Sequence, residues 1–166
     1  MTKLSDVKNK LKIRRANIDD VQAIYETIFE AFESYKKYYT REAYEMTVIS
    51  HIEIEKRIRS NKKEILVAVY NNEVVGTATI KIGDKNNIHI QSMAVRPEYQ
   101  EKGIGLCILE EINKLAQKKG CKTVSLECFH PLRKAISLYE KCGFNRTGKT
   151  RDYYGVKIFE MLKDIG

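Results

Sequence analysis

The fold is decided by residues 95–105, which read VRPEYQEKGIG. The apolar run 88–95 leads into this stretch and predicts a strand, and Ile104, Ile108 and Ile112 follow at the spacing of a buried helix face. The stretch is therefore a loop from a strand to a helix. The first turn of a helix has four free N–H groups at the positive end of its dipole, and glycines keep side chains away from them. This combination predicts a site for a phosphate group.

Two common nucleotide-binding loops do not fit this stretch. The P-loop needs a glycine-rich run that ends in Gly-Lys-Ser/Thr, which residues 95–105 lack. The dinucleotide fingerprint would need a small residue three positions after Gly105, where the chain has Ile108. The glycines could also serve only to ease helix packing, and the loop by itself leaves that interpretation open.

Outward from this loop, the hydrophobic pattern predicts seven strands and four helices in the order β-α-α-β-β-β-α-β-α-β-β. The strands are expected at 11–15, 64–70, 74–82, 88–95, 123–129, 144–148 and 156–162. The helices are expected after the caps Asn17 and Asp19, over 40–60, from Gly103 to Gly120, and over 133–142. A helix joins the strands at 88–95 and 123–129, so these two should be parallel and the hairpins elsewhere antiparallel. The expected fold class is α/β, with a mixed, mostly antiparallel central sheet and helices on both faces.

Length and composition predict one domain. The chain has 166 residues, of which 43% are hydrophobic and 31% charged. We expect a charged N-terminal arm over 1–10 and a single domain over 11–166. No apolar run approaches the roughly 18–20 residues of a membrane helix, and the N-terminus lacks a signal-peptide pattern, so no membrane association and a cytoplasmic location are expected.

The net charge of +8 admits anionic partners without choosing among them. The basic residues are spread along the chain instead of forming a stripe, so no nucleic acid is expected as a partner. The four cysteines form no Cys-x-x-Cys pair and lie in apolar segments, so we expect buried thiols and no metal site. They are Cys107, Cys121, Cys128 and Cys142.

Two motifs together resemble those of the GNAT acetyltransferases. The first is Gln100-x-x-Gly103-x-Gly105 after a strand that ends MAV at 93–95, and it is similar to the family's acetyl-CoA motif. The second is residues 135–144, AISLYEKCGF, similar to the family's later helix signature. The resemblance covers nearly the whole chain and is strongest from 88 to 144.

This resemblance implies a fold in which the parallel strands at 88–95 and 123–129 splay apart and acetyl-CoA enters the gap. A bulge near 93–95 would free an amide for the oxyanion of the reaction. The implied cofactor-binding residues are Met93, Ala94 and Val95 for the pantetheine arm, then Gln100, Glu101, Lys102, Gly103, Ile104, Gly105 and Leu106 around the pyrophosphate. One departure is Leu132, which stands where many relatives have an asparagine that touches the cofactor.

The resemblance also implies catalytic residues for direct transfer in a ternary complex. Tyr139 is the expected acid that protonates the CoA thiolate. The base that deprotonates the amine is expected to be His89, Glu127 or a water chain. A covalent route through a cysteine is disfavoured, because Cys107, Cys128 and Cys142 have no obvious histidine partner at short range.

The acceptor stays open at this stage. The position of Glu127 favours a protein N-terminus or lysine, whereas Glu30, Glu33 and Glu42 favour a small polyamine-like amine. Five tyrosines between residues 25 and 44, and Tyr153 or Tyr154 near the last hairpin, are candidate substrate contacts. A homodimer is possible. The alternative to an enzyme is a non-catalytic, regulatory module that binds acyl-CoA.

Overall fold

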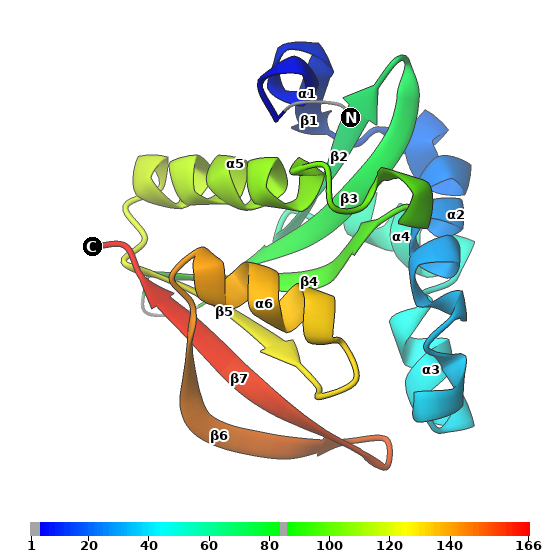
Figure 1. The fold of residues 1–166 in the computed structure, drawn as a ribbon, viewed down its shortest axis with the longest axis vertical. Coiled ribbons are helices and arrows are strands. Elements are labelled where there is room, and N and C mark those ends of the chain that lie inside the picture. The colour runs from blue at the N-terminus through cyan, green and yellow to red at the C-terminus, as the bar shows by residue number, and fades with distance from the viewer. Residues whose placement is uncertain (1–3, 84–85) are drawn as a thin grey trace.

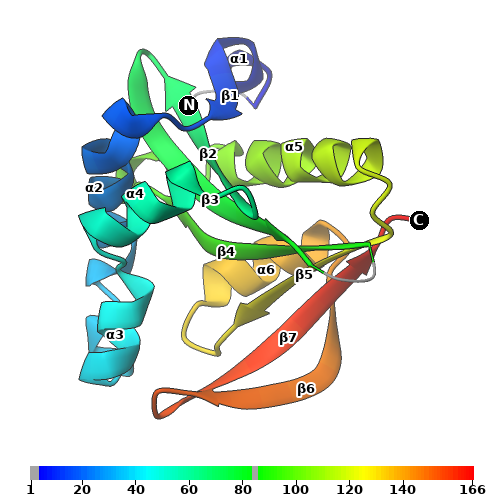
Figure 2. The same ribbon diagram turned by 180° about the vertical axis from the view of Figure 1, so that it is seen from behind.

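The sheet has seven strands in the order β1-β2-β3-β4-β5-β7-β6. It is mixed but mostly antiparallel, as the sequence predicts. The computed structural model describes residues 4–83 and 86–166. Helices cover both faces of the sheet, with α5 and α6 on one side and α2, α3 and α4 on the other (Figures 1 and 2). The strands are β1 Leu11–Arg15, β2 Lys63–Tyr70, β3 Glu73–Ile82, β4 Asn87–Val95, β5 Thr123–Cys128, β6 Asn145–Tyr153 and β7 Val156–Asp164.

The helices bury one face each against the sheet. They are α1 Leu4–Lys10, α2 Val21–Glu33, α3 Arg41–Thr47, α4 His51–Arg59, α5 Ile104–Lys118 and α6 Arg133–Lys141. Alternate residues of β2 enter two separate cores: Leu66 packs with α5, and Ile65 and Val67 pack with α2 and α4. A strand covered on both faces reads as an unbroken apolar run, which is why 64–70 is so apolar. In the part of the chain that the structure describes, no helix is long and apolar enough to cross a membrane.

The single helix expected over 40–60 is wrong. Two helices, α3 and α4, occupy this region, and Val48 leaves the helical conformation between them with ψ of 80°. The Ser50 side chain accepts a hydrogen bond from the Glu53 amide at 3.1 Å and so begins α4 anew. The apolar residues keep helical spacing across the break, which hides this cap from a periodicity argument.

The charged segment expected as an arm packs on the domain in its described part. Residues 4–10 form α1, and Val7 is 1% exposed among core residues that include Leu109 and Ile112 of α5. Val7 anchors the helix although Asp6, Lys8 and Lys10 surround it, because it fills a place in the core. The first three residues lie outside the described part, and the division of the chain at residue 10 stays a prediction.

The parallel pair, β4 and β5, comes apart halfway along. The strands pair from Asn87 with Thr123 to Ile90 with Leu126. Within the described residues no further pair forms, although β4 continues to Val95, and the two strands diverge (Figure 1). The splay implied by the resemblance is therefore present.

A bulge in β4 lies at the mouth of this splay. Thr77 of β3 pairs with Ala94, but Thr79 pairs with Gln91, so Ser92 and Met93 together stand opposite a single residue of β3. Ser92 has φ of 50°, a conformation that costs a residue with a side chain about 1 kcal/mol. The bulge bends β4 away from β5 and begins one residue before the expected stretch 93–95.

Candidate active site

A cavity of about 700 Å³ opens where β4 and β5 diverge. It reaches from the loop before α5 past the bulge to α2, α3 and the tip of the β6–β7 hairpin. Eleven of the thirteen residues that the sequence proposes for the site line this cavity: Tyr139, Glu127, His89, Met93, Ala94, Val95, Gln100, Glu101, Gly103, Gly105 and Leu106. The other two do not: Ile104 is buried in the core, and the Lys102 ammonium lies over the Tyr99 ring, 5.4 Å from its centroid. Both were expected to act chiefly through their backbone amides.

The loop before α5 presents free backbone amides to the cavity. Gly103 stands at the N-cap of α5 with φ of +86° and offers no capping side chain. Cys107 is the first residue at this end of α5 whose backbone amide donates a hydrogen bond within the helix, to the Gly103 carbonyl oxygen at 3.0 Å. The Gln100 side chain donates to the Val95 carbonyl oxygen at 2.9 Å and holds the loop against the end of β4. The geometry is that of an anion site at a helix N-terminus.

The two glycines of the loop serve different purposes. Gly103 meets a backbone requirement, because its positive φ disfavours any residue with a Cβ atom. Gly105 meets a packing requirement, because a Cβ atom there would lie 2.7 Å from Cδ2 of Leu138 on α6. The packing interpretation that the sequence leaves open thus applies to Gly105 and also to Gly103, where a Cβ atom would meet the Leu4 side chain of α1. Beside the cavity, α5 and α6 approach closely.

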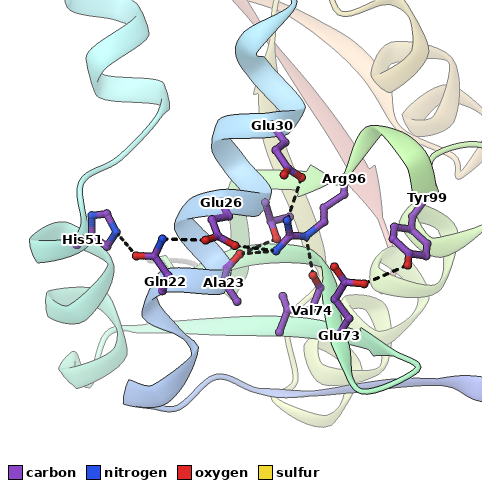
Figure 3. A network of polar contacts seen from close by, with 10 residues as sticks. Gln22, Ala23, Glu26, Glu30, His51, Glu73, Val74, Arg96 and Tyr99 are labelled. Atoms are coloured by element: carbon purple, nitrogen blue, oxygen red, sulfur yellow. Dashed lines mark hydrogen bonds and ion pairs between the residues drawn. The ribbon is translucent and has the colours of Figure 1, made fainter.

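A buried arginine fixes the start of this loop to the rest of the fold. Arg96 is 6% exposed, and its Nε donates to the Val74 carbonyl oxygen at 2.8 Å (Figure 3). Its other nitrogens contact the carboxylates of Glu30 at 2.9 Å and Glu26 at 3.5 Å on α2. Glu30 is therefore bound to Arg96 and does not line the cavity, contrary to the idea that it attracts a cationic acceptor. The network continues from Glu26 through Gln22 to His51 on α4 (Figure 3).

Tyr139, the acid that the sequence analysis expects, lies in the cavity wall. The residue is 8% exposed, and its ring packs edge-on against Phe144 with centroids 5.9 Å apart. Burial raises the pKa of its hydroxyl far above the ordinary value, so the proton is retained at any working pH. Within residues 4–83 and 86–166 we find no hydrogen-bond partner for this hydroxyl. A retained proton with no competing acceptor is what a proton donor needs.

His89 and Glu127 lie side by side on the opposite face of the splayed strands from α5 and α6. Nε2 of His89 is 3.9 Å from Oε1 of Glu127, and Nδ1 is 2.8 Å from the Ser125 hydroxyl. Burial lowers the pKa of His89 below its ordinary value, although Glu127 opposes this shift, so the ring is neutral near pH 7. Both oxygens of Glu127 accept hydrogen bonds from Arg151, at 2.6 and 2.8 Å. The arrangement therefore favours His89 over Glu127 as the base.

Aromatic side chains form the far wall of the cavity. Tyr39 contacts Phe129 at the end of β5 with ring centroids 4.6 Å apart, and Phe32 of α2 lies edge-on to Tyr39 at 6.4 Å. Thr40 donates a hydrogen bond to the Tyr154 carbonyl oxygen and thereby ties the β6–β7 hairpin to this wall. Burial raises the pKa of Tyr39, so this hydroxyl also stays protonated. The wall is apolar in its body and polar at its phenol groups.

Sequence reasoning missed three polar residues of the site. Arg57 of α4 donates to the hydroxyl groups of Ser92 in the bulge, at 3.0 Å, and of Thr79, at 3.1 Å. Arg151 comes from β6, which extends five residues past its expected end at 148. Ser125 is two residues from Glu127 on β5 and directly beside His89, so strand alternation and the parallel register would have identified it.

The cysteines are not arranged as nucleophiles. Cys128 lines the cavity, but burial raises the pKa of its thiol to about 11, which leaves it protonated at neutral pH. Cys107 and Cys121 are buried as well, and Cys142 is partly exposed. This is consistent with direct transfer to the amine.

Comparison with known proteins agrees with this geometry. Residues 20–144 match the model of the acetyltransferase (GNAT) family. An alanine N-acetyltransferase of ribosomal protein bS18 from Escherichia coli K12 is 40% identical over 63 residues, which are 38% of this chain and 43% of that protein. The chain thus spans less than half the length of this relative. An uncharacterised N-acetyltransferase of Bacillus subtilis is 27% identical over 139 residues, 81% of this chain and 89% of its own length.

A solved structure matches the fold over its whole length. The PaiA N-acetyltransferase of Thermoplasma acidophilum, crystallised with coenzyme A, superposes with a TM-score of 0.78 at 27% identity and covers 93% of this chain and 99% of its own. Family model, sequence relatives and fold agree with the splayed strands, the open amides and the family motifs described above. This protein therefore belongs to the GNAT family of acetyltransferases, which use acetyl-CoA to acetylate amines.

Proposed function

We propose that this protein transfers the acetyl group of acetyl-CoA to the α-amino group of a peptide or protein. The observation that carries the proposal is the charge of the cavity. In the part of the chain that the structure describes, only two carboxylates line it, Glu101 and Glu127. Each is already paired, Glu101 with Lys134 at 3.7 Å and Glu127 with Arg151 at 2.6 Å.

A cavity of this kind does not suit a polyamine. A polyamine carries several positive charges and needs unpaired carboxylates to replace its hydration. Of the acids that favoured such a substrate in the sequence, Glu30 binds Arg96, and Glu33 and Glu42 are not among the lining residues. Arg57, which is paired with Glu53 at 3.1 Å, also lines the cavity and offers no carboxylate to a polyamine. An acceptor with one reacting amine on a neutral framework fits better.

The base also favours an α-amine over a lysine side chain. An α-ammonium group has a pKa of about 7.8 and a lysine about 10.4. His89, with its pKa below the ordinary value, can take the proton of the first at much lower cost than that of the second. The aromatic wall and the half-exposed Met46 at its edge supply contact for the residues that follow the amine. The relative named for a ribosomal-protein alanine supports the same class of acceptor.

The residues then have the following roles in the proposal. Nε2 of His89 takes a proton from the acceptor ammonium, and the amine attacks the thioester carbonyl. An amide at the bulge, in the stretch Ser92 to Val95, stabilises the oxyanion. Tyr139 gives its proton to the departing sulfur, the new amide nitrogen sheds its second proton to water, and Tyr139 and His89 return to their starting protonation states by exchange with solvent. The free amides from Glu101 to Leu106 bind the pyrophosphate, and Leu132 makes no asparagine-type contact.

Acceptor competition tests this proposal. The protein is incubated with acetyl-CoA and one of three amines: a short neutral peptide with a free α-amine, the same peptide blocked at its N-terminus but carrying one lysine, or spermidine. CoA release is followed with a thiol reagent, and mass spectrometry locates the acetyl group. We expect kcat/KM to be at least tenfold higher for the free α-amine. A preference for spermidine or for the lysine would contradict the proposal.

We also propose a cytoplasmic location and assembly as a homodimer.

A further inference from the structure

A row of hydrogen bonds runs across the paired half of β4 and β5 behind the proposed base. Nδ1 of His89 lies 2.8 Å from Oγ of Ser125, its register partner on β5. Asn87 donates from Nδ2 to the same Oγ at 3.1 Å, and Thr123 donates to Oδ1 of Asn87 at 2.8 Å. Ser125 is 4% exposed, so water does not compete for its hydroxyl. The row ends at the imidazole, on the side away from Glu127.

We propose that Ser125 is a positioning residue for His89: it accepts a hydrogen bond from Nδ1 and so keeps Nε2 as the nitrogen that takes the proton of the acceptor amine. The proposal depends on the proposed role of His89 as the base. It adds a residue with no part in binding either substrate.

The hydrogen-bond inventory of Ser125 supports this role. A serine hydroxyl has one donor hydrogen and two acceptor lone pairs. Asn87 uses one lone pair, and Thr123 fixes the amide of Asn87 in the orientation that donates. The remaining lone pair accepts from Nδ1–H, which is present both in the neutral ring with a free Nε2 and in the imidazolium, at a distance of 2.8 Å. No rearrangement is needed when the base takes up its proton.

Four charged side chains near His89 also affect the stability of its protonated ring. The carboxylates of Glu127 on β5 and Glu160 on β7 favour the imidazolium, whereas Lys81 on β3 and Arg151 on β6 disfavour it. Oε1 of Glu127 lies 3.9 Å from Nε2, beyond hydrogen-bond distance, and favours the imidazolium through its charge. The imidazolium thus has a hydrogen-bond acceptor at Nδ1, Ser125, and a carboxylate charge near Nε2. A hydrogen bond to the charged ring is stronger than one to the neutral ring, so loss of the hydroxyl destabilises the charged form more.

The test is a double-mutant cycle read through the pH dependence of kcat/KM. Ser125→Ala should lower kcat/KM about tenfold and move its acid limb to lower pH by about one unit, the equivalent of one charge-assisted hydrogen bond. Ser125→Thr keeps the hydroxyl and should restore both values to near the wild type. In a His89→Ala background, Ser125→Ala should change kcat/KM less than twofold, because the group through which it acts is gone. Thermal unfolding and acetyl-CoA affinity are measured for every variant.

Two results would overturn the proposal. One is a loss of kcat/KM in Ser125→Ala that is equally large in the wild-type and His89→Ala backgrounds, which would mark a merely structural effect. The other is a loss without movement of the acid limb. If His89→Ala itself keeps the wild-type rate and pH profile, the base assignment fails, and the positioning role fails with it. That outcome is recognised in the single variant, before Ser125 is changed.

Discussion

Replacing Tyr139 by phenylalanine isolates the proposed acid. The substitution removes one oxygen and keeps the edge-on contact with Phe144. We find no hydrogen bond from this hydroxyl to the described residues, so none should be lost, and the stability change should stay within about 1 kcal/mol. Acetyl-CoA affinity should also be unchanged, because the pyrophosphate is assigned to the backbone amides of the loop before α5.

The expected loss of rate follows from the chemistry of the leaving group. General acids contribute about 10²–10⁴-fold, and a thiol with an ordinary pKa of about 8.5 is a fair leaving group without help. The low end of that range applies, so kcat should fall about 100-fold. This corresponds to an activation free energy that is higher by about 2.7 kcal/mol. Burial keeps the Tyr139 proton in place, so the acid should not titrate below pH 10 in the wild type.

The assay is single-turnover CoA release with saturating acetyl-CoA and peptide. A matched control is Tyr70→Phe on β2, a tyrosine that packs against Tyr99 in the cavity wall but does not itself line the cavity, and this variant should keep the wild-type rate. An unchanged rate in Tyr139→Phe, with acetyl-CoA binding intact, would refute the acid role. An equal fall in the control variant would refute the reasoning that ties the effect to the cavity.

Three further predictions concern the loop, its anchor and the base. Arg96→Met should lower the free energy of unfolding, measured with denaturant, by about 2–3 kcal/mol. The main reason is that the Val74 carbonyl loses its charged donor, whereas the half-exposed carboxylates of Glu26 and Glu30 regain water. A change below about 0.5 kcal/mol would contradict this. Gly103→Glu adds strain at φ of +86° and a negative charge at the anion site, so the acetyl-CoA Kd should rise at least tenfold, whereas Gly120→Glu, at φ of +73° and away from the cavity, should leave it unchanged. Because burial lowers the pKa of His89, the acid limb of kcat/KM should lie below pH 6.5 and vanish in His89→Ala; a limb that persists in the variant would belong to another group.

The sequence predicted the seven strands in their order along the chain, and most of the cavity, because both depend on local patterns. The loop at 95–105 joins a strand to a helix in the structure, and the β4–β5 pair is parallel as the crossover rule requires. The expected free amides also lie at the start of α5, since helix geometry fixes them wherever the helix begins.

The parts that sequence reasoning missed depend on contacts between distant segments. Arg57 reaches the bulge only because α4 starts afresh at Ser50, which helical periodicity conceals. Arg151 pairs with Glu127 because β6 continues through an exposed, polar stretch that carries no strand signal. Glu30 is adjacent to the acceptor region in sequence, but its carboxylate is taken by Arg96, 66 residues away along the chain.

A thermal-shift titration with acetyl-CoA tests most directly that this cavity binds the acetyl donor. A ligand that binds only the folded protein at 100 times its Kd adds about 2.7 kcal/mol of stability. For a chain of this size that corresponds to a rise in Tm of roughly 5–10 °C. We predict a saturable rise of this order with acetyl-CoA and a much smaller one with ATP. No rise at millimolar acetyl-CoA would contradict the account, because the open amides and the splayed strands would then hold no donor.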